Sequence, residues 1–320
     1  MNKKAKALSS ILLGFTLVLT GCSVNAQENS SELKQEQSVK ESKKENKLTK
    51  GQEMAKILSS TNWQGTKVYD KNHNDVTKEN ANFIGLAKFD GETSRYEFFD
   101  KNTTETRGDK GTFFITNDGK SRILISESMG YQAVVKITEL NKNKFTYKRV
   151  GKDAKGNDVE VFVEHVPYKE KALSFTDPDK TLNTSTGEIV TNIDGDSILS
   201  STNWQGIVAL DENGNDVSNY NKNFLGLAKY DFKTNRYEFF NAMTGKSRGD
   251  YGYYDVVHGN KLRAHVSLGD NKYGAILELT ELNENKFTYK RMGKDKDGKE
   301  ILITVEHIPY HGDFKLKFTK

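Results

Sequence analysis

The chain has 320 residues and a formal net charge of +4, from 48 Lys and Arg against 44 Asp and Glu. Charged residues of mixed sign make up 29% of the chain, which indicates a solvated surface. Nucleic-acid binding would require a clustered basic face, so the composition excludes that class of partner. The length suits two domains of ordinary size.

The N-terminus has the pattern of a secretion signal. Three lysines in the first six residues precede an apolar run at 11–19, which is too short for a stable membrane span. The run ends in Leu19-Thr20-Gly21-Cys22, which resembles the lipobox of bacterial lipoproteins. The resemblance implies a signal peptide at 1–21 and palmitate on Cys22, so that the lipid anchors the chain at the extracellular face of the cytoplasmic membrane. An ordinary signal peptide that ends near a cysteine is the alternative.

The segment after the lipobox has the composition of a tether. Residues 23–50 alternate Glu, Lys, Gln, Ser and Asn with almost no large apolar side chains. Such a segment cannot offset the entropy of ordering, so we predict that residues 22–50 are the lipidated cysteine and a disordered tether. Because Cys22 is the only cysteine, its lipidation excludes disulfides, Cys-type zinc sites and a cysteine nucleophile.

The rest of the chain is a duplication. The nonapeptide ILSSTNWQG occurs at 57–65 and again at 198–206, and the same shift relates RYEFF at 95–99 to RYEFF at 236–240. A period of about 141 residues is far too long for a solenoid repeat and suits a whole domain. The sequence therefore predicts two copies of one domain, at 51–175 and 197–320, joined by a linker at 176–196.

Within each copy the apolar residues recur with a period near two, which is typical of β-strands. Turn clusters rich in Gly, Asp and Asn separate the strand patterns. One or two helical turns are expected before each tryptophan, and a ninth short strand at 172–176. The eight main strands of the first copy are expected near 63–69, 83–90, 95–100, 110–116, 121–127, 131–140, 144–150 and 159–166.

Eight consecutive antiparallel strands joined by short turns have to hide their edges. Closure into a barrel removes the edges altogether, whereas a sandwich leaves some of them exposed. A short helix followed by a tryptophan on the first strand resembles the calycin superfamily of lipocalin-like barrels. The sequence therefore predicts an all-β protein with two tandem up-and-down barrels, each closed at one end by Trp63 or Trp204. The lipocalin Gly-x-Trp signature is absent, so no lipocalin ligand follows.

A second resemblance covers both copies. NWQG, GLAK[FY]D, RYEFF, RGD, NKFTYKR and EH[VI]PY, doubled behind a lipobox, are similar to a family of Gram-positive surface lipoproteins known only as a domain of unknown function. The resemblance implies a secreted β-rich domain and no particular activity.

Candidate ligand-binding residues follow from the barrel prediction. An eight-stranded barrel is either filled by its own side chains or holds one small ligand, and the sequence leaves both open. If Arg95 and Glu97 point inward they would orient a polar ligand, whereas outward they would form a solvated pair. We favour Tyr96 and Phe98 as the inward pair. The candidate ligand-binding residues are Trp63, Arg95 and Tyr131 in the first copy and Trp204, Arg236 and Tyr273 in the second.

Each copy also contains the tripeptide Arg-Gly-Asp, at 107–109 and 248–250. On an exposed tip this sequence is what animal integrins recognise, so a host adhesin is one alternative function. A tight turn that enters a strand also needs Gly between polar residues. The candidate adhesion residues are Arg107, Gly108, Asp109, Arg248, Gly249 and Asp250.

Signals of catalysis are weak. GKSRG at 245–249 fits the Gly-x-Ser-x-Gly elbow, but no helix is expected after it and the first copy lacks the serine. No two of the six histidines have metal-binding spacing, and His165 and His307 are expected to be structural residues near the end of the last strand. We therefore predict no metal, no cofactor and no enzyme activity, with a hydrolase as an alternative. The expected function is that of a cell-surface lipoprotein that binds a small ligand, a wall component or a protein.

Overall fold

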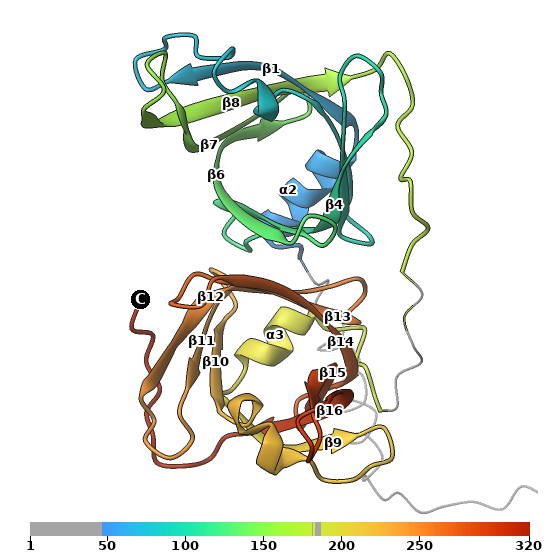
Figure 1. Cartoon of the computed structure of the whole chain (residues 1–320), viewed down its shortest axis with the longest axis vertical. Helices are drawn as coiled ribbons and strands as arrows, with labels where there is room; N and C mark the ends of the chain where they lie inside the picture. Colours follow the sequence, from blue (N-terminus) through green and yellow to red (C-terminus); the bar gives the residue numbers. More distant parts are fainter. Residues whose placement is uncertain (1–46, 181, 183–186) are drawn as a thin grey trace, which may run out of the picture. The chain divides into compact units, whose positions relative to one another are not determined.

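The computed structural model describes residues 47–180, 182 and 187–320 (Figure 1). The expected signal peptide, the lipidation site Cys22 and nearly all of the expected tether lie outside the described residues. Among the residues that are described, no helix has the length and apolar character needed to cross a bilayer.

The first copy folds into a closed barrel of eight strands. Each strand pairs antiparallel with the next, and the last strand pairs with the first, so no edge remains open. The strands are β1 (Asn62–Asp70), β2 (Leu86–Asp90), β3 (Arg95–Phe99), β4 (Thr106–Ile115), β5 (Ser121–Ser126), β6 (Tyr131–Asn141), β7 (Lys144–Lys152) and β8 (Asp158–Tyr168).

The second copy repeats this barrel with the same strand order and closure. Its strands are β9 (Trp204–Asp211), β10 (Leu227–Asp231), β11 (Arg236–Phe240), β12 (Ser247–Val257), β13 (Leu262–Ser267), β14 (Tyr273–Leu282), β15 (Phe287–Lys294) and β16 (Glu300–Pro309). The predicted all-β fold of two tandem barrels is therefore confirmed.

Two local differences from the predicted strands have physical causes. Residues Ala81–Phe83 form a 3₁₀ turn, η1, so β2 begins at Leu86 instead of residue 83. Residues 172–176 are not a strand, because barrel closure already pairs β8 with β1 and leaves no free edge. The loop containing η1 instead brings Asn82 and Phe83 to the barrel opening.

A short helix closes one end of each barrel. Helix α2 (Lys50–Ser59) begins with a capping box between Thr49 and Gln52, and its side contacts β2, β4 and β6 (Figure 1). The helix therefore starts at the last residue of the expected tether. In the second barrel α3 (Gly195–Ser200) contacts β10 and β12, and it begins in the last two residues of the expected linker.

The two tryptophans fix these helices to the barrels. Trp63 and Trp204 are fully buried, and their indole Nε1 groups donate hydrogen bonds to the carbonyl oxygens of Leu58 (2.7 Å) and Leu199 (2.8 Å). Each ring also packs edge-on against a core phenylalanine, at 5.8 Å from Phe145 in the first barrel. The prediction that a tryptophan closes one end of each barrel agrees with this placement.

The segment that follows each last strand crosses back over the outside of its barrel. We call this segment the strap; it comprises residues 173–176 in the first barrel and 316–319 in the second. Leu173 packs in a buried cluster with Leu86, Phe99 and Tyr168, and Phe175 lies 4.4 Å from the guanidinium carbon of Arg95. The second strap repeats these contacts with Leu316 on Leu227 and Phe240, and with Phe318 4.9 Å from Arg236.

The strap buries a carboxylate on the outer face. Glu97 has no exposed surface, and it accepts hydrogen bonds from the Thr176 backbone N–H (2.9 Å), the Thr176 hydroxyl (2.7 Å) and the Thr106 hydroxyl (2.6 Å). Glu238 is bound in the same way by Thr319 and Ser247. The outward placement of the Arg95 and Glu97 pair fits our preference for Tyr96 and Phe98 inside. The alternative of a solvated pair is wrong, because the strap covers Glu97.

Removal of the strap hydroxyl should destabilise the first barrel only when Glu97 is present. We expect Thr176→Val to lower the free energy of unfolding by about 1.5–3 kcal/mol, the usual loss of a hydrogen bond to a charged group. In a Glu97→Met background the same change should cost close to nothing. Urea unfolding of the four proteins measures this cycle, and an equal loss in both backgrounds would contradict it.

Candidate functional site

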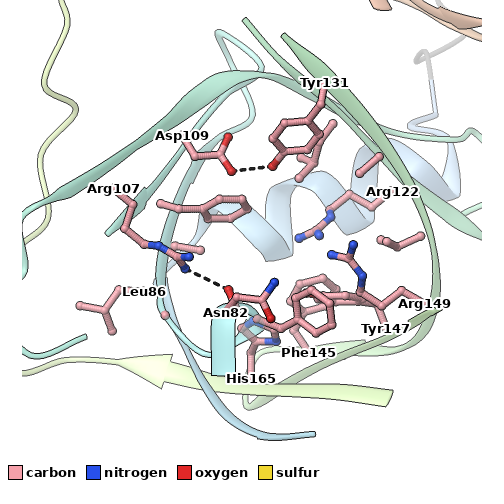
Figure 2. Close-up of a pocket in the computed structure, with 17 residues that line it drawn as sticks. Asn82, Leu86, Arg107, Asp109, Arg122, Tyr131, Phe145, Tyr147, Arg149 and His165 are labelled. Atoms are coloured by element: carbon pink, nitrogen blue, oxygen red, sulfur yellow. Dashed lines mark hydrogen bonds between the residues drawn. The ribbon is translucent and has the colours of Figure 1, made fainter. Parts of the chain in front are cut away.

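The first barrel is hollow at the end away from α2. Its cavity has a volume of about 290 Å³ and is lined by side chains from seven of the eight strands and from the loop containing η1 (Figure 2). The lining combines apolar and aromatic groups with three arginines and one carboxylate. The charged and polar residues are Asn82, Arg107, Asp109, Arg122, Tyr131, Tyr147, Arg149 and His165.

Strand direction sets the depth of each arginine. The turn at 116–121 lies beside α2, because the Gly51 N–H donates to the Asn117 carbonyl, and Arg122 follows this turn directly. Arg122 is therefore at the floor of the cavity. Arg107 is the second residue of β4 and Arg149 lies near the end of β7, so both are at the opposite, open end.

Arg122 is a buried cation without an acidic partner. Only 3% of its surface is exposed, and its guanidinium carbon lies 4.7 Å from the Tyr147 ring centroid and 5.1 Å from that of Phe145. Cation–π attraction to these rings offsets part of the cost of burial. Burial lowers the pKa of Arg122, and the nearby charge of Arg149 acts in the same direction. The Nε of Arg122 is buried with no hydrogen-bond partner among the described residues.

The other two arginines are held by the loop around η1. The guanidinium of Arg149 stacks over the Phe83 ring at 3.9 Å from its centroid, and Arg107 donates to the Asn82 carbonyl at 3.1 Å. Figure 2 shows the Arg107 contact and the guanidinium of Arg149 directed into the cavity. The loop therefore keeps two cationic groups at the opening in fixed orientations.

The only acidic residue that lines this cavity is already fully engaged. The carboxylate of Asp109 accepts hydrogen bonds from the hydroxyls of Tyr96 (3.0 Å), Ser126 (2.8 Å) and Tyr131 (Figure 2). Burial raises the pKa of Tyr96 and of Tyr131, and the Asp109 carboxylate adds to this in both, so both hydroxyls stay protonated as donors. Asp109 therefore does not neutralise the arginines through an ion pair.

This geometry explains the Arg-Gly-Asp tripeptide. Gly108 has φ of +73°, which only glycine adopts without strain, and the register between β3 and β4 shifts beside it. Arg107 and Asp109 are two residues apart, and both line the cavity. Gly249 has φ of +72°, and Asp250 accepts from Tyr237 and Tyr273 in the same manner. An integrin ligand needs its aspartate on an exposed tip, and neither Asp109 nor Asp250 is placed in this way.

His165 lies beside the arginine floor. Only 6% of it is exposed, and its ring stacks at 5.3–5.4 Å from Phe145 and Tyr147. Burial lowers the pKa of His165 to about 3, and the positive charge of Arg122 adds to this, so the imidazole is neutral at physiological pH. Its Nδ1 has no hydrogen-bond partner among the described residues. His165, which was expected to be a structural residue, therefore also lines the cavity.

The second barrel repeats the cavity with a volume of about 430 Å³. Its equivalents of the lining residues include Asn223, Arg248, Asp250, Arg263, Tyr273, Tyr289, Arg291 and His307. Arg263 is 2% exposed, and its Nε again has no partner among the described residues. Burial and the charge of Arg263 lower the pKa of His307 to about 3.

Two substitutions make the second cavity more polar. His265 replaces Leu124 on the lining, and Tyr230 replaces Phe89 beside the buried arginine. The Tyr230 hydroxyl accepts from the Arg263 Nη1 at 2.9 Å, a contact that Phe89 cannot provide. Burial strongly lowers the pKa of His265, and the charges of Arg263 and Arg291 add to this. The two cavities therefore share their arginines and differ in the groups around them.

The sequence-predicted ligand residues divide into three groups. Tyr131 and Tyr273 line the cavities. Trp63 and Trp204 are at the closed ends and do not line them. The placement of Arg95 and Arg236 as cavity residues is wrong, because both lie on the outer face against the strap phenylalanines.

Sequence reasoning missed Arg122 and Arg149. A signal was available, because Arg149 alternates with Phe145 and Tyr147 on one face of a predicted strand, and both arginines recur in the second copy. A charged residue on an otherwise apolar face indicates a polar function inside the barrel.

The weak catalytic signals do not form a site. Ser247 of the Gly-x-Ser-x-Gly match donates to the buried Glu238 on the outer face, and no histidine is hydrogen-bonded to it among the described residues. The part of the chain covered by the structure contains no group of three His, Cys, Asp or Glu residues placed to hold a metal ion.

A family model described as a domain of unknown function, DUF4822, matches residues 55–175 and again 196–318. The chain belongs to the DUF4822 family. Each match covers one barrel, so the DUF4822 domain is a single closed eight-stranded barrel here. No match was found among curated proteins.

Two solved structures have low similarity to this DUF4822 chain. A protein of unknown function from the DUF3598 family of Nostoc punctiforme PCC 73102 is 9% identical, over 81% of this chain and 99% of that chain, with a TM-score of 0.21. A putative thioesterase II from Thermobifida fusca YX is 6% identical, over 60% of this chain and 74% of that chain, with a TM-score of 0.11. At these TM-scores neither similarity supports an argument about the domain.

The buried histidines predict how stability depends on pH. Because the pKa of His165 and of His307 is about 3 in the folded state and about 6.5 when unfolded, the unfolded chain takes up protons first as the pH falls. The free energy of unfolding therefore decreases between pH 6.5 and 3, by up to about 1.4 kcal/mol per pH unit for each histidine. The double variant His165→Gln, His307→Gln should show a shallower decrease in urea unfolding between pH 6 and 4. Parallel pH profiles for both proteins would contradict the prediction.

Proposed function

We propose that this protein binds a small molecule inside each of its two barrels and has no catalytic role. The observation that carries the proposal is the open cavity that occurs at the same place in both copies, with buried polar groups that no protein atom satisfies. A cavity built for packing alone would be filled and apolar. Here the lining instead includes arginines, such as Arg122 and Arg149 in the first barrel, that have no acidic partner among the described residues.

The cavity size supports a ligand larger than a few waters. Volumes of about 290 and 430 Å³ reach the range of small-molecule sites. The lining also has the usual composition of such sites, in which apolar and aromatic walls surround a few polar groups of fixed orientation. The loop containing η1 holds Arg107 and Arg149 in place before a ligand arrives, which reduces the entropy lost on binding.

The proposal includes a location at the cell surface. The lipobox that ends in Cys22 supports lipid anchoring at the extracellular face of a Gram-positive cytoplasmic membrane, with the tether holding the barrels away from it. The ligand would then be a solute or a soluble wall component that reaches the barrels from outside. We propose neither adhesion through the Arg-Gly-Asp tripeptides nor hydrolysis, since no observation favours either.

The proposal is tested with two dyes that share one skeleton. N-phenyl-1-naphthylamine is uncharged, and 1-anilinonaphthalene-8-sulfonate adds a sulfonate to it. We expect the full chain to bind at least one dye at two sites, seen as a rise in dye fluorescence. The double variant Ala87→Phe, Ala228→Phe, which places rings in the two cavities, should lose at least tenfold in affinity.

An exposed alanine provides the matched control. Ala154→Phe adds the same ring in the exposed turn between β7 and β8 and should bind like the wild type. Near-UV circular dichroism shows whether each variant is folded. If the double variant does not fold, the single variants Ala87→Leu and Ala228→Leu take its place. Dye binding that persists in the folded cavity variants, or no binding of either dye to the wild type, would refute the proposal.

A further inference from the structure

We propose that the ligand of each barrel is an organic anion. Its acidic group is held between the arginine at the floor of the cavity and one at its opening, and its apolar body lies against the aromatic wall. In the first barrel the arginines are Arg122 and Arg149, and in the second Arg263 and Arg291. This inference rests on the proposed function, because it specifies the class of molecule that enters the cavities.

Both cavities have a net positive formal charge. Three arginines and one aspartate line the first barrel, which gives the cavity a net formal charge of +2. The second barrel has three arginines and Asp250, and therefore the same net charge. His165 and His307 are neutral, so they do not change this balance near physiological pH. A cavity with an unbalanced positive charge favours a negatively charged guest.

The protein does not neutralise these arginines with ion pairs of its own among the described residues. The ion pairs among the described residues do not include Arg107, Arg122 or Arg149. They also do not include the equivalent arginines of the second barrel. Asp109 and Asp250 are held by tyrosine hydroxyls instead. A buried charge without a partner is strongly unfavourable, and an anion at this point would remove that cost.

The floor of each cavity presents a guanidinium group. Both Arg122 and Arg263 are at least 97% buried and line their cavities. A guanidinium offers parallel N–H groups that match the two oxygens of a carboxylate or sulfonate. Stacking on Tyr147 or Tyr289 orients each guanidinium plane before the anion arrives.

The rest of the cavity suits the body of such a ligand. The lining of the first barrel also includes Phe98, Leu124, Ala133 and Val135, a wall that suits an apolar or aromatic group. In the second barrel His265 replaces Leu124, and Tyr230 occupies one donor of Arg263. The first barrel should therefore accept the more apolar anions, and the second the more polar ones.

The same dye pair tests the inference, because its members differ only in the sulfonate. We expect the sulfonated dye to bind the full chain at least tenfold more tightly than the neutral dye. Arg122→Met, which keeps an unbranched apolar chain among the rings, should remove this preference at one of the two sites. Arg263→Met should remove it at the other.

Controls separate this inference from a general effect of charge or folding. Arg95→Met removes an arginine that lies outside the barrel and should leave both dyes unaffected. Arg122→Lys keeps the charge without the parallel donors and should retain part of the preference. If Arg122→Met does not fold by near-UV circular dichroism, Arg149→Met, which is partly exposed, takes its place.

The outcomes distinguish the two proposals. Equal affinity of both dyes, with a loss of both in the cavity-filling variants, would leave ligand binding standing and overturn the inference of an anion. A sulfonate preference that survives Arg122→Met and Arg263→Met in folded protein would also overturn it. Binding of neither dye would refute ligand binding itself.

Discussion

Pairing of the last strand with the first is the constraint on which the rest of this structure depends. Once β8 pairs with β1, and β16 with β9, every strand has two neighbours and one of its faces is turned inward. Side chains that alternate along a strand are then sorted into an interior set and an exterior set. The interior positions near α2 are filled by aromatic groups, and those further from α2 leave the cavity open.

The arginines are the exception to this sorting, and they give the cavity its chemistry. A guanidinium at the floor of a barrel is tolerated because aromatic rings surround it, which compensates for part of its lost hydration. The protein keeps its one nearby carboxylate occupied with hydroxyl donors, so the positive charge persists. Stability is thus reduced at the point where a ligand would bind, a pattern common at functional sites.

The outer face has a different buried charge with a different solution. Glu97 and Glu238 are covered by the straps and receive three hydrogen bonds each, so they are structural groups. Arg122 differs from these carboxylates, because no acidic group pairs with it among the described residues. Both arrangements occur in both copies, so neither depends on the surroundings of one barrel.

The sequence alone determined the duplication, the strands and the all-β fold, because period-two alternation and turn residues are local signals. It also placed Arg149 on the face of Phe145 and Tyr147. Only the tertiary structure decided which face of each strand points inward, since that depends on closure between residues about a hundred positions apart. The tertiary structure also covers Arg95 with a strap on the outer face, and it turns Asp109 of the Arg-Gly-Asp tripeptide towards hydroxyls from three strands. Such contacts join distant strands, and no local pattern encodes them.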